Sequence, residues 1–414
     1  MPATVTPARL RWLAVVVFVF SCVLNYLDRQ VLGMMLVIWH RHPAFAFSDR
    51  DYGLLISAFS LAYAISAPFM GWFLDRAGLN RGISISVALW ALASVGTGTA
   101  NNVSQLLAWR CLLGVAEASG ISAVGKMGAL YLFPKERAVG AALSQLGLSV
   151  GAGIAPQFAN YFSAQFSWRW AFYASGMVSL LWIPAWLLTS RLIPPPLLED
   201  VPDEHPGSSW ALLRDPRLWA LMGANFFGMT VYSLWTNWVP RYLEKMHHLA
   251  ASGIAHFAGW VPICGYAGAF LGGTLSWRWI RSGMSPAESR KRVCLLSSIV
   301  VLVTAAIPLA PNALWATIGM SLSFFWIASW STNLYTLPVD IYGARHAAFG
   351  VSALVFAFGA MQAVVSRPLG QAIERWGFAP VCIVFAFLPL AAQMLLQAFV
   401  HESAPLAEPA VAVS

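Results

Sequence analysis

Residues 13–38 read LAVVVFVFSCVLNYLDRQVLGMMLVI, which combines the length of a membrane-spanning helix with two adjacent charges, Asp28 and Arg29. A hydrocarbon core about 30 Å thick is crossed by about 20 apolar residues in helical form. A charge at the centre of a lipid-exposed helix costs roughly 2.5–3.5 kcal/mol. We therefore expect Asp28 and Arg29 to face a polar space that other helices enclose.

The same combination recurs in residues 106–133, where Arg110 and Glu117 interrupt an otherwise apolar stretch. These two residues are seven apart, so both point to the same side of a helix that turns 100° per residue. Given the directions in which the two helices would cross the membrane, we expect all four charged groups to converge near the centre or the outer half of one helix bundle.

The whole chain has the composition of an integral membrane protein. Of its 414 residues 58% are hydrophobic and 10% are charged, and its mean hydropathy is +0.65, whereas a soluble domain carries about 25% charged residues. Apolar stretches recur along the chain, and we predict twelve transmembrane helices, at about residues 11–38, 51–74, 82–100, 104–133, 138–162, 168–190, 216–240, 253–277, 292–310, 312–336, 347–372 and 378–400.

The net charge of +8 is explained by membrane topology rather than by nucleic acid binding. Most of the 25 Lys and Arg residues fall in loops on the side that carries both ends of the chain, and cytoplasmic loops are enriched in these residues. We expect both termini in the cytoplasm. The first apolar stretch is too long for the hydrophobic region of a cleaved signal peptide.

A strong change in composition follows the sixth apolar stretch, where three prolines at 194–196 precede an acidic segment. Prolines in series cannot continue a helix. We predict an N-terminal six-helix bundle (1–192), a cytoplasmic linker (193–213), a C-terminal six-helix bundle (214–400) and a cytoplasmic tail (401–414). Two such bundles rock about a site at the midplane of the membrane.

The sequence favours neither a metal site nor an enzyme. The five cysteines lie in apolar stretches without paired spacing, and no nucleophile–base pair, set of metal ligands or phosphate-binding loop stands out. We expect no cofactor, with protons as the coupling ion.

Several motifs together resemble a known family. GWFLDRAGLNR at 71–81 matches the G-x-x-x-D-R-x-G-x-[RN]-[RK] loop of the major facilitator superfamily. That fold is an all-α membrane protein with twelve helices in two six-helix bundles. NYLDR (25–29), RCLLGVAEA (110–118), FPKER (133–137) and WTNWVPRYL (235–243) resemble its anion:cation symporter family, within which the chain is most similar to bacterial hexuronate and galactonate transporters. Residues 121–123 read Ile-Ser-Ala where that family usually has Phe-Pro-Ala, which leaves the particular substrate open.

The resemblance implies that Asp28 and Glu117 take up protons and that Arg110 couples to the substrate. From the residues themselves, a guanidinium group holds a carboxylate in a two-point fork, so Arg29 and Arg110 are the expected ligands of an organic anion. When an arginine turns to the substrate, its former carboxylate partner takes a proton more easily. The alternative is a set of static buried ion pairs that hold the helices together.

Other residues are assigned to gating and to substrate contact. In the 71–81 loop we expect Asp75, Arg76 and Arg81 to form a conformational gate, with Glu136 and Arg137 as latch partners. Lys126 is about 180° round the helix from Glu117 and is left open between a cavity cation and a group that reaches the inner interface. Polar and aromatic groups suit a hydroxylated carbon chain, and the candidates are Tyr26, Tyr63, Gln145, Asn225, Tyr232, Trp330, Asn333 and Gln362.

The sequence therefore predicts a proton-coupled symporter in a bacterial inner membrane that imports a small organic anion, a hexuronate or aldonate, by alternating access. A proton-coupled carrier of monocarboxylates or dicarboxylates is an alternative. A proton/drug antiporter is a weaker one, because cationic or apolar drugs would favour acids without two arginines. A non-transporting sensor is disfavoured by the short linker and tail. We expect a monomer from the family, and the number of protons and the choice between import and exchange are left open.

Overall fold

The computed structural model of the protein describes residues 8–40, 47–133, 136–193 and 209–400. Residues 194–208 of the predicted linker and the whole predicted tail lie outside the described residues. Regular structure in the described ranges is helical, as the predicted all-α fold requires. The first half contains α1 (Ala8–His40), α2 (Asp49–Ala77), α3 (Leu79–Thr99), α4 (Val103–Glu117), α5 (Gly120–Tyr131), α6 (Arg137–Gln165) and α7 (Trp168–Leu192).

The second half opens with a short 3-10 helix and continues with long helices. Its elements are η1 (Ser209–Arg214), α8 (Pro216–His247), α9 (Ala251–Ala258), α10 (Trp260–Arg281), α11 (Pro286–Val301), η2 (Leu302–Leu309), α12 (Ala313–Trp376) and α13 (Phe378–Phe399). The long α12 is two helices that meet at Gly343, whose φ of 70° is not helical.

Eleven helical stretches among the described residues are long and apolar enough to cross a membrane. They include α4 with α5, α9 with α10, and α11 with η2 as single spans, and the two parts of α12 as separate spans. The remaining long helix, α8, has 32 residues but is less apolar. With α8 the spans follow the order predicted from the sequence.

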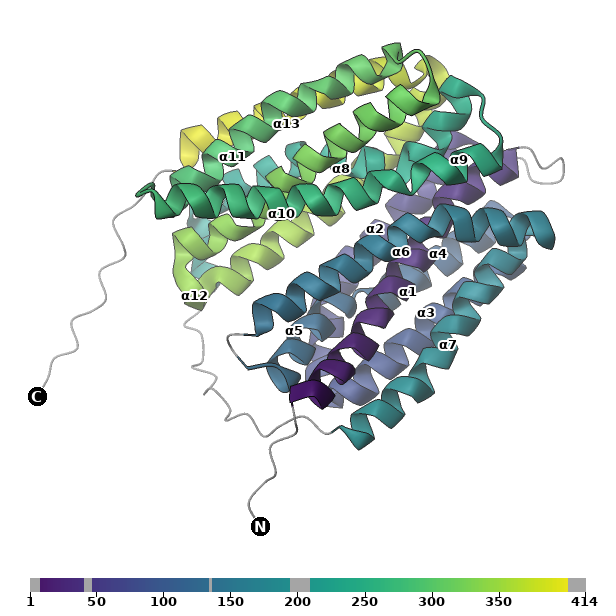
Figure 1. Ribbon diagram of the computed structural model, residues 1–414, viewed down its shortest axis with the longest axis horizontal. Coiled ribbons are helices and arrows are strands. Elements are labelled where there is room, and N and C mark those ends of the chain that lie inside the picture. The colour runs from purple at the N-terminus through teal and green to yellow at the C-terminus, as the bar shows by residue number, and fades with distance from the viewer. Residues whose placement is uncertain (1–7, 41–46, 134–135, 194–208, 401–414) are drawn as a thin grey trace, which may run out of the picture.

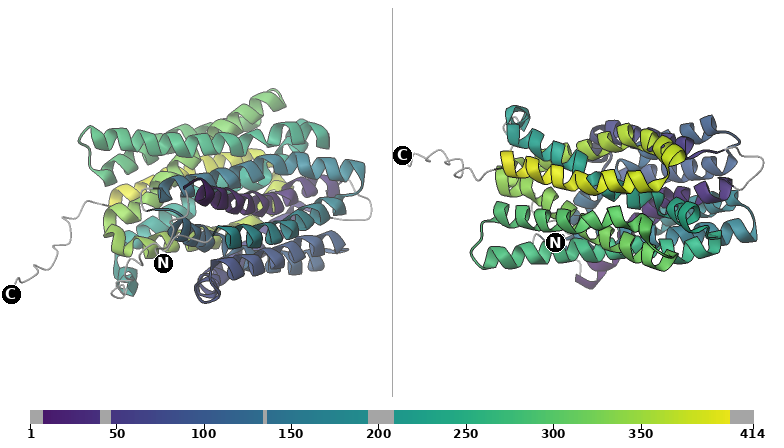
Figure 2. Two further views of the ribbon diagram at one scale, coloured as in Figure 1. Left: turned by 60° about the horizontal axis from the view of Figure 1, so that its bottom comes forward. Right: turned by 90° about the horizontal axis from the view of Figure 1, so that it is seen from above.

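The helices form two bundles (Figure 1). One bundle contains α1 to α7, and the other contains α8 to α13. Helices of both bundles run along the long axis of the molecule (Figure 2). The bundles meet where α2 packs on α12, α1 on α8, and α6 on α9 and α10. We call the end at which α1 begins and α13 finishes the termini end, and the opposite end the far end.

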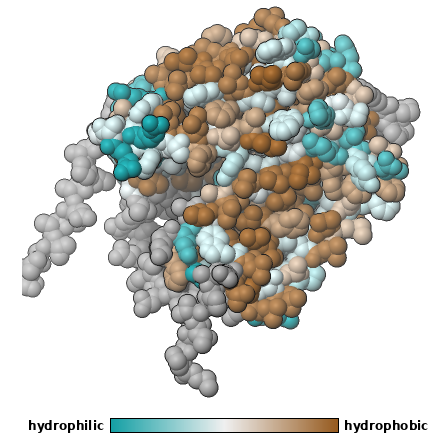
Figure 3. Space-filling model, viewed as in Figure 1, coloured by the Kyte–Doolittle hydropathy of each residue, from teal (hydrophilic) through white to brown (hydrophobic). Residues whose placement is uncertain are grey.

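Apolar side chains cover the middle of the molecular surface in a broad band, and hydrophilic side chains gather toward its two ends (Figure 3). Exposed leucine, valine, isoleucine and aromatic side chains occur on both bundles. A soluble protein rarely exposes a continuous apolar surface of this kind. The distribution is that of a protein whose middle is embedded in lipid.

Side-chain caps begin three of the helices that start at the far end. The Ser48 hydroxyl accepts a hydrogen bond from the Asp51 amide (3.1 Å), and the Asp51 carboxylate accepts one from the Ser48 amide (3.1 Å). This reciprocal pair is a capping box at the start of α2. Asn102 and Asn312 cap α4 and α12 through side-chain oxygens that accept from the amides of Gln105 and Trp315. These caps fix where the chain turns back into the bundle.

Two spans differ from the prediction. The fourth is divided into α4 and α5 at Ala118 and Ser119, directly after Glu117. The seventh was expected to end at Pro240, but α8 continues to His247. Pro240 lies inside α8, and the charged residues that follow it contact the other bundle through the ion pairs described below.

Candidate functional site

A cavity of about 540 Å³ lies between the bundles and is lined by both of them. Its walls include Phe18 and Cys22 from the first half of α1, Val124 from α5 and Ala141 from the start of α6, so the cavity extends toward the termini end. The polar residues that line it are Ser21, Asn25, Tyr26, Arg29, Ser60, Tyr63, Glu117, Ser144, Gln145, Tyr232, Ser331, Thr332, Tyr335, Thr336 and Gln362.

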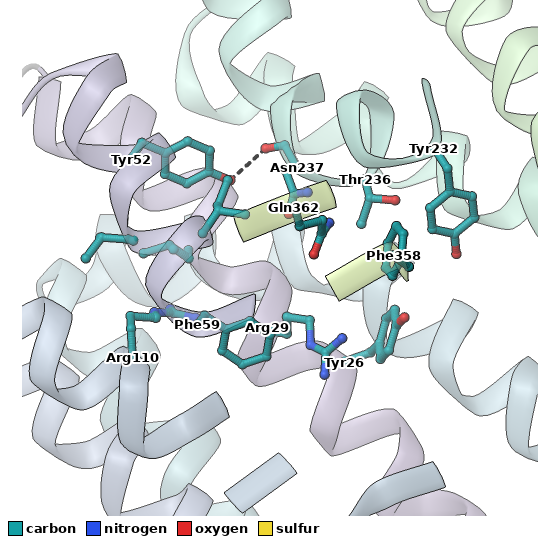
Figure 4. Close-up of a pocket in the computed structure, with 13 residues that line it drawn as sticks. Tyr26, Arg29, Tyr52, Phe59, Arg110, Tyr232, Thr236, Asn237, Phe358 and Gln362 are labelled. Atoms are coloured by element: carbon teal, nitrogen blue, oxygen red, sulfur yellow. Dashed lines mark hydrogen bonds between the residues drawn. The ribbon is translucent and has the colours of Figure 1, made fainter. Parts of the chain in front are cut away.

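A second pocket, of about 40 Å³, lies on the far-end side of this cavity (Figure 4). The two spaces share six lining residues, which form the layer between them: Tyr26, Arg29, Phe59, Tyr232, Phe358 and Gln362. Arg110 and Tyr52 line only the smaller pocket. Arg29 belongs to this layer, and Figure 4 shows Arg29 and Arg110 on opposite sides of Phe59.

Arg29 is held by a carboxylate and by aromatic rings. Its Nε and Nη2 donate to Oε2 of Glu117 at 3.0 and 2.7 Å. The guanidinium carbon lies 4.9, 4.7 and 5.3 Å from the ring centres of Tyr26, Phe59 and Tyr63, within the range of cation–π attraction. The Glu117 side chain is fully buried, whereas 21% of the Arg29 side chain is exposed to the cavity. Arg29 is therefore both fixed and accessible.

Arg110 is a buried cation without an ion pair among the described residues. It is 2% exposed, its Nε has no hydrogen-bond partner, and it lines the far-end pocket beside Tyr52. The second oxygen of Glu117, Oε1, is likewise buried and without a partner. An unpaired buried charge costs free energy, so this arrangement favours an anion at Arg110 or a new pairing with Glu117.

The four predicted charges lie near one another in the first bundle, where Glu117 and Arg110 act on Asp28 through space. Arg29 lines both spaces, Arg110 only the far-end pocket and Glu117 only the main cavity, whereas Asp28 lines neither space. Adjacent residues on a helix point 100° apart, so Asp28 cannot share the direction of Arg29. Its carboxylate points to α3 and α7, where Ser94 and Ser179 donate to it.

Gln362 joins the bundles within the dividing layer. Its Oε1 accepts a hydrogen bond from Ser60 on α2 at 2.9 Å, and its Nε2 donates to Ser233 on α8 at 3.1 Å. Tyr26, Tyr63, Gln145 and Tyr232, which the sequence also indicated, line the main cavity together with Gln362. The structure thus brings these predicted contact residues to one space.

Three other predicted contact residues lie away from the cavity. Asn225 is fully buried and donates to the Leu354 carbonyl oxygen at 2.6 Å. Trp330 is fully buried and packs on Gly228, and Asn333 donates to a carbonyl oxygen of its own helix. The prediction followed the aromatic side of α12, but its cavity side carries Ser331, Thr332, Tyr335 and Thr336. A few hydroxyl groups in an otherwise apolar helix do not show from the sequence alone which side of that helix lines a cavity.

Lys126 lies on α5 and does not line the cavity. Its Nζ donates to the Asp75 carboxylate at 3.0 Å and to the Leu74 carbonyl oxygen at 2.9 Å. This pair ties α5 to α2 within the first bundle. The substrate-contact assignment of Lys126 is therefore corrected: Lys126 lies on α5, beyond the break at Ala118 and Ser119, and its ammonium group points to Asp75 on α2.

The predicted latch also has different partners. Glu136 accepts from Arg11 on α1 at 3.1 Å, and Arg137 donates to the Leu132 carbonyl oxygen at 3.4 Å. Arg76 lies over the ring of Trp72 at 4.6 Å and is exposed, as is Arg81. Glu136 and Arg137 thus do not pair with the residues of the 71–81 loop among the described contacts.

A charged network at the far end was not foreseen. Arg241 on α8 donates to both oxygens of Asp49 on α2, at 2.6 and 3.1 Å, and to Glu244 at 2.7 Å. Lys245 lies 3.6 Å from Asp49 and donates to the Ile373 carbonyl oxygen at 2.6 Å. Of the ion pairs between described residues, those to Asp49 are the ones that join the two bundles.

Contacts of the backbone also hold the two bundles together at the far end. The Tyr52 hydroxyl donates to the Asn237 carbonyl oxygen of α8 at 2.7 Å. A side chain at Gly53 or Gly370 would meet the backbone of the opposing helix, so α2 and α12 touch closely there. The far end is therefore closed, and the main cavity lies toward the termini end. Asp49 and Arg241 are too far apart in sequence for helical spacing to have paired them.

The described geometry can be compared with known proteins. The family model of the Major Facilitator Superfamily matches residues 18–366. The chain belongs to the major facilitator superfamily. As a superfamily member it is a multi-pass membrane transporter and not an enzyme.

Sugar-acid transporters are among the proteins to which the chain is similar, and two of them match it over almost its whole length. The hexuronate transporter of Escherichia coli K12 is 26% identical over 409 residues, which cover 94% of this chain and 93% of that protein. The D-galactonate transporter of Escherichia coli O6:H1 is 22% identical, with 93% and 94% covered. The galacturonate transporter of Dickeya chrysanthemi is 28% identical over 281 residues, which cover 64% of this chain and 81% of that protein.

A solved structure supports the fold. A bacterial homologue of the human lysosomal transporter Spinster, in an inward-facing and unoccupied conformation, has a TM-score of 0.75 at 19% identity. The match covers 96% of this chain and 99% of that one. At this identity the likeness concerns the major facilitator fold alone.

Proposed function

We propose that this protein imports a small organic anion of the sugar-acid class, a hexuronate or an aldonate, together with protons. The observation that carries the proposal is the arrangement around the dividing layer: Arg29 lies in the layer and pairs with Glu117, which lines the main cavity, and Arg110 lines the far-end pocket. The three groups have a net charge of one positive unit when all are ionised, which suits a monoanion. Guanidinium groups bind carboxylates through two parallel hydrogen bonds.

The rest of the cavity suits a hydroxylated carbon chain. Facing Arg29 across the bundles are hydroxyl and amide groups of the second bundle, among them Thr332, Tyr335 and Gln362. A volume of about 540 Å³ is within the usual range of small-molecule sites, roughly 300–1,000 Å³. The resemblance to hexuronate, galacturonate and galactonate transporters supports the same substrate class.

The distribution of basic loop residues supports a bacterial inner-membrane orientation with the termini end in the cytoplasm. In that orientation the cavity opens toward the cytoplasm, and the Asp49–Arg241 network closes the outer side. We take this to be the inward-facing state of an alternating-access cycle. Both bundles and the whole cavity come from one chain, so we propose that the monomer is the working unit, with no cofactor.

Proton coupling follows from the carboxylates. When the substrate carboxylate takes Arg29, Glu117 loses its hydrogen-bond donors while it remains buried, and a proton then neutralises it. An anion that enters a negative-inside cell works against about 2.3 kcal/mol per charge per 100 mV. One proton per monoanion removes that cost, and a second makes uptake voltage-driven. Glu117 and Asp28 together permit either ratio.

Binding to the purified protein tests the substrate class. Glucuronate, galacturonate, galactonate, lactate and tartrate would be titrated calorimetrically into wild type and into Arg110→Gln, with Arg367→Gln as a control at an exposed arginine. We expect one of the sugar acids to bind and the Arg110→Gln variant to lose it. Binding of lactate or tartrate, without binding of any sugar acid, would show that the substrate is a simple carboxylate and not a sugar acid.

A further inference from the structure

Asp28 occupies a site of its own inside the first bundle. It is 1% exposed. Its Oδ1 accepts a hydrogen bond from the Ser94 hydroxyl at 3.1 Å, and its Oδ2 accepts one from the Ser179 hydroxyl at 3.3 Å. The Ser175 hydroxyl lies 2.9 Å from that of Ser94. Three hydroxyl groups from α3 and α7 thus surround the carboxylate.

No cation within the described residues lies at ion-pair distance from Asp28. Neighbouring Arg29 turns to Glu117, and α3 and α7 present only the serine hydroxyls to the carboxylate. Glu117 and Arg110 on α4 act on it through space and without contact. Asp28 therefore differs from Glu117, which has a guanidinium partner.

Serine hydroxyls suit a carboxyl group that changes its protonation state. A hydroxyl has one donor and two acceptor positions, so it can donate to an ionised carboxylate or, after rotation, accept from a protonated one. A buried carboxylate held only by neutral donors pays a desolvation cost that its protonated form avoids. An arginine partner would stabilise only the ionised carboxylate, whereas these serines can form hydrogen bonds with both the ionised and the protonated carboxyl group.

The site lies close to the main cavity but does not open into it. Asn25 is three residues before Asp28 on α1, and Trp90 is four residues before Ser94 on α3. Both line the main cavity, and both have a buried nitrogen without a partner, Nδ2 of Asn25 and Nε1 of Trp90. Asp28 and its serines therefore lie one helical turn from the cavity wall, apart from the anion site.

We propose that Ser94, Ser175 and Ser179 are positioning residues of a proton site at Asp28 that is separate from the anion site at Arg29, Arg110 and Glu117. The proposal deepens the proposed function and rests on it. The proton passes from hydronium to a carboxylate oxygen of Asp28 and returns to water on release, and no bond of the substrate changes. Proton and anion are then linked through α1, which carries both Asp28 and Arg29.

An infrared pH titration of the purified protein in lipid tests the proposal without a substrate. The carbonyl band of protonated Asp28 is assigned by its loss in Asp28→Asn, and its midpoint is then followed in Ser94→Ala and Ser179→Ala. Each variant removes a donor to the ionised form, so the protonated form persists to higher pH. We expect the midpoint to rise by about one pH unit. Ser94→Cys, with its weaker donor, should lie between wild type and Ser94→Ala.

Ser86→Ala is the matched control, because Ser86 is a fully buried serine of α3, the helix of Ser94, and its hydroxyl has no hydrogen-bond partner among the described residues. The proposal is overturned if neither alanine variant moves the midpoint, or if Ser86→Ala moves it equally. Uptake of galacturonate by the wild-type protein is measured in parallel with the infrared titration. An absence of uptake would count against the proposed function, while the infrared midpoints would still decide the role of the serines.

Discussion

Arg29 donates two hydrogen bonds to a single oxygen of Glu117, at 3.0 and 2.7 Å, and leaves the other oxygen buried without a partner. Seven residues before Glu117 on the same span, Arg110 is buried and has no ion pair with any described residue. The pairing is thus incomplete on both sides. An unpaired buried charge costs free energy, so we infer that these groups exchange partners during transport.

Glu117→Gln should separate proton coupling from substrate movement. Glutamine has nearly the shape of glutamic acid but cannot release a proton. We expect proton-driven accumulation to fall to the background level, while exchange of labelled for unlabelled substrate across the membrane continues. Glu374→Gln, at an exposed position of α12, should leave both activities unchanged. Accumulation at the wild-type level in Glu117→Gln would remove the residue from the coupling mechanism.

Arg110→Gln should weaken substrate binding roughly 30-fold or more, because loss of one partner of a buried charge pair costs about 2–5 kcal/mol. Arg110→Lys keeps the charge but loses the two-point fork, so it should recover only part of the affinity. The measurement is calorimetric titration with the substrate. An Arg110→Lys variant as tight as wild type would show that the charge alone matters.

Asp49→Asn should loosen the far end, because it removes the charge that joins α2 to Arg241 and Lys245. A cysteine placed at Thr236, which lines the far-end pocket, would report the change in a background without native cysteines. We expect a membrane-impermeant thiol reagent applied from the far side to react several times faster. Asp215→Asn, which breaks a pair within the second bundle, is the control. Equal rates in Asp49→Asn and its parent would show that the network is not a gate.

Lys126→Gln tests whether Lys126 pairs with Asp75, as the structure shows, or contacts the substrate, as the sequence suggested. The Lys126–Asp75 pair ties two helices at the termini end and lies outside the cavity lining. We expect substrate affinity to stay within about twofold of wild type, since the substitution touches no lining group, while the turnover rate changes with the stability of the gate. A loss of affinity comparable to that of Arg110→Gln would return Lys126 to the substrate site.

Much of the fold could be predicted because the positions of the helices depend on patterns within single segments of the sequence. Twenty-residue apolar stretches and the 71–81 motif each reflect a requirement of one segment, and the helices lie where these patterns placed them. Spacing along one helix also placed Arg110 and Glu117 on the same side. Adjacent residues point 100° apart on a helix, but this spacing alone does not say which of Asp28 and Arg29 faces the cavity, since adjacent Asn25 and Tyr26 both line it.

The remaining errors concern contacts between distant segments. Nothing local pairs Asp49 with Arg241, because their contact depends on how the two bundles meet. On α12 we predicted Trp330 and Asn333 as substrate contacts because they share a side of the helix with other aromatic residues. That side is buried in the interior of the second bundle. The cavity side is marked by Thr332 and Tyr335, whose hydroxyl groups can be told from ordinary helix residues only once the neighbouring helices are placed.

The most direct test of the central claim is uptake of radiolabelled galacturonate, glucuronate and galactonate into proteoliposomes with an imposed inward proton gradient. The account predicts that one of these acids accumulates above equilibrium, that a protonophore abolishes the accumulation, and that Glu117→Gln does not accumulate it. Accumulation that persists in the presence of the protonophore, or that requires a different ion gradient, would contradict proton-coupled sugar-acid transport.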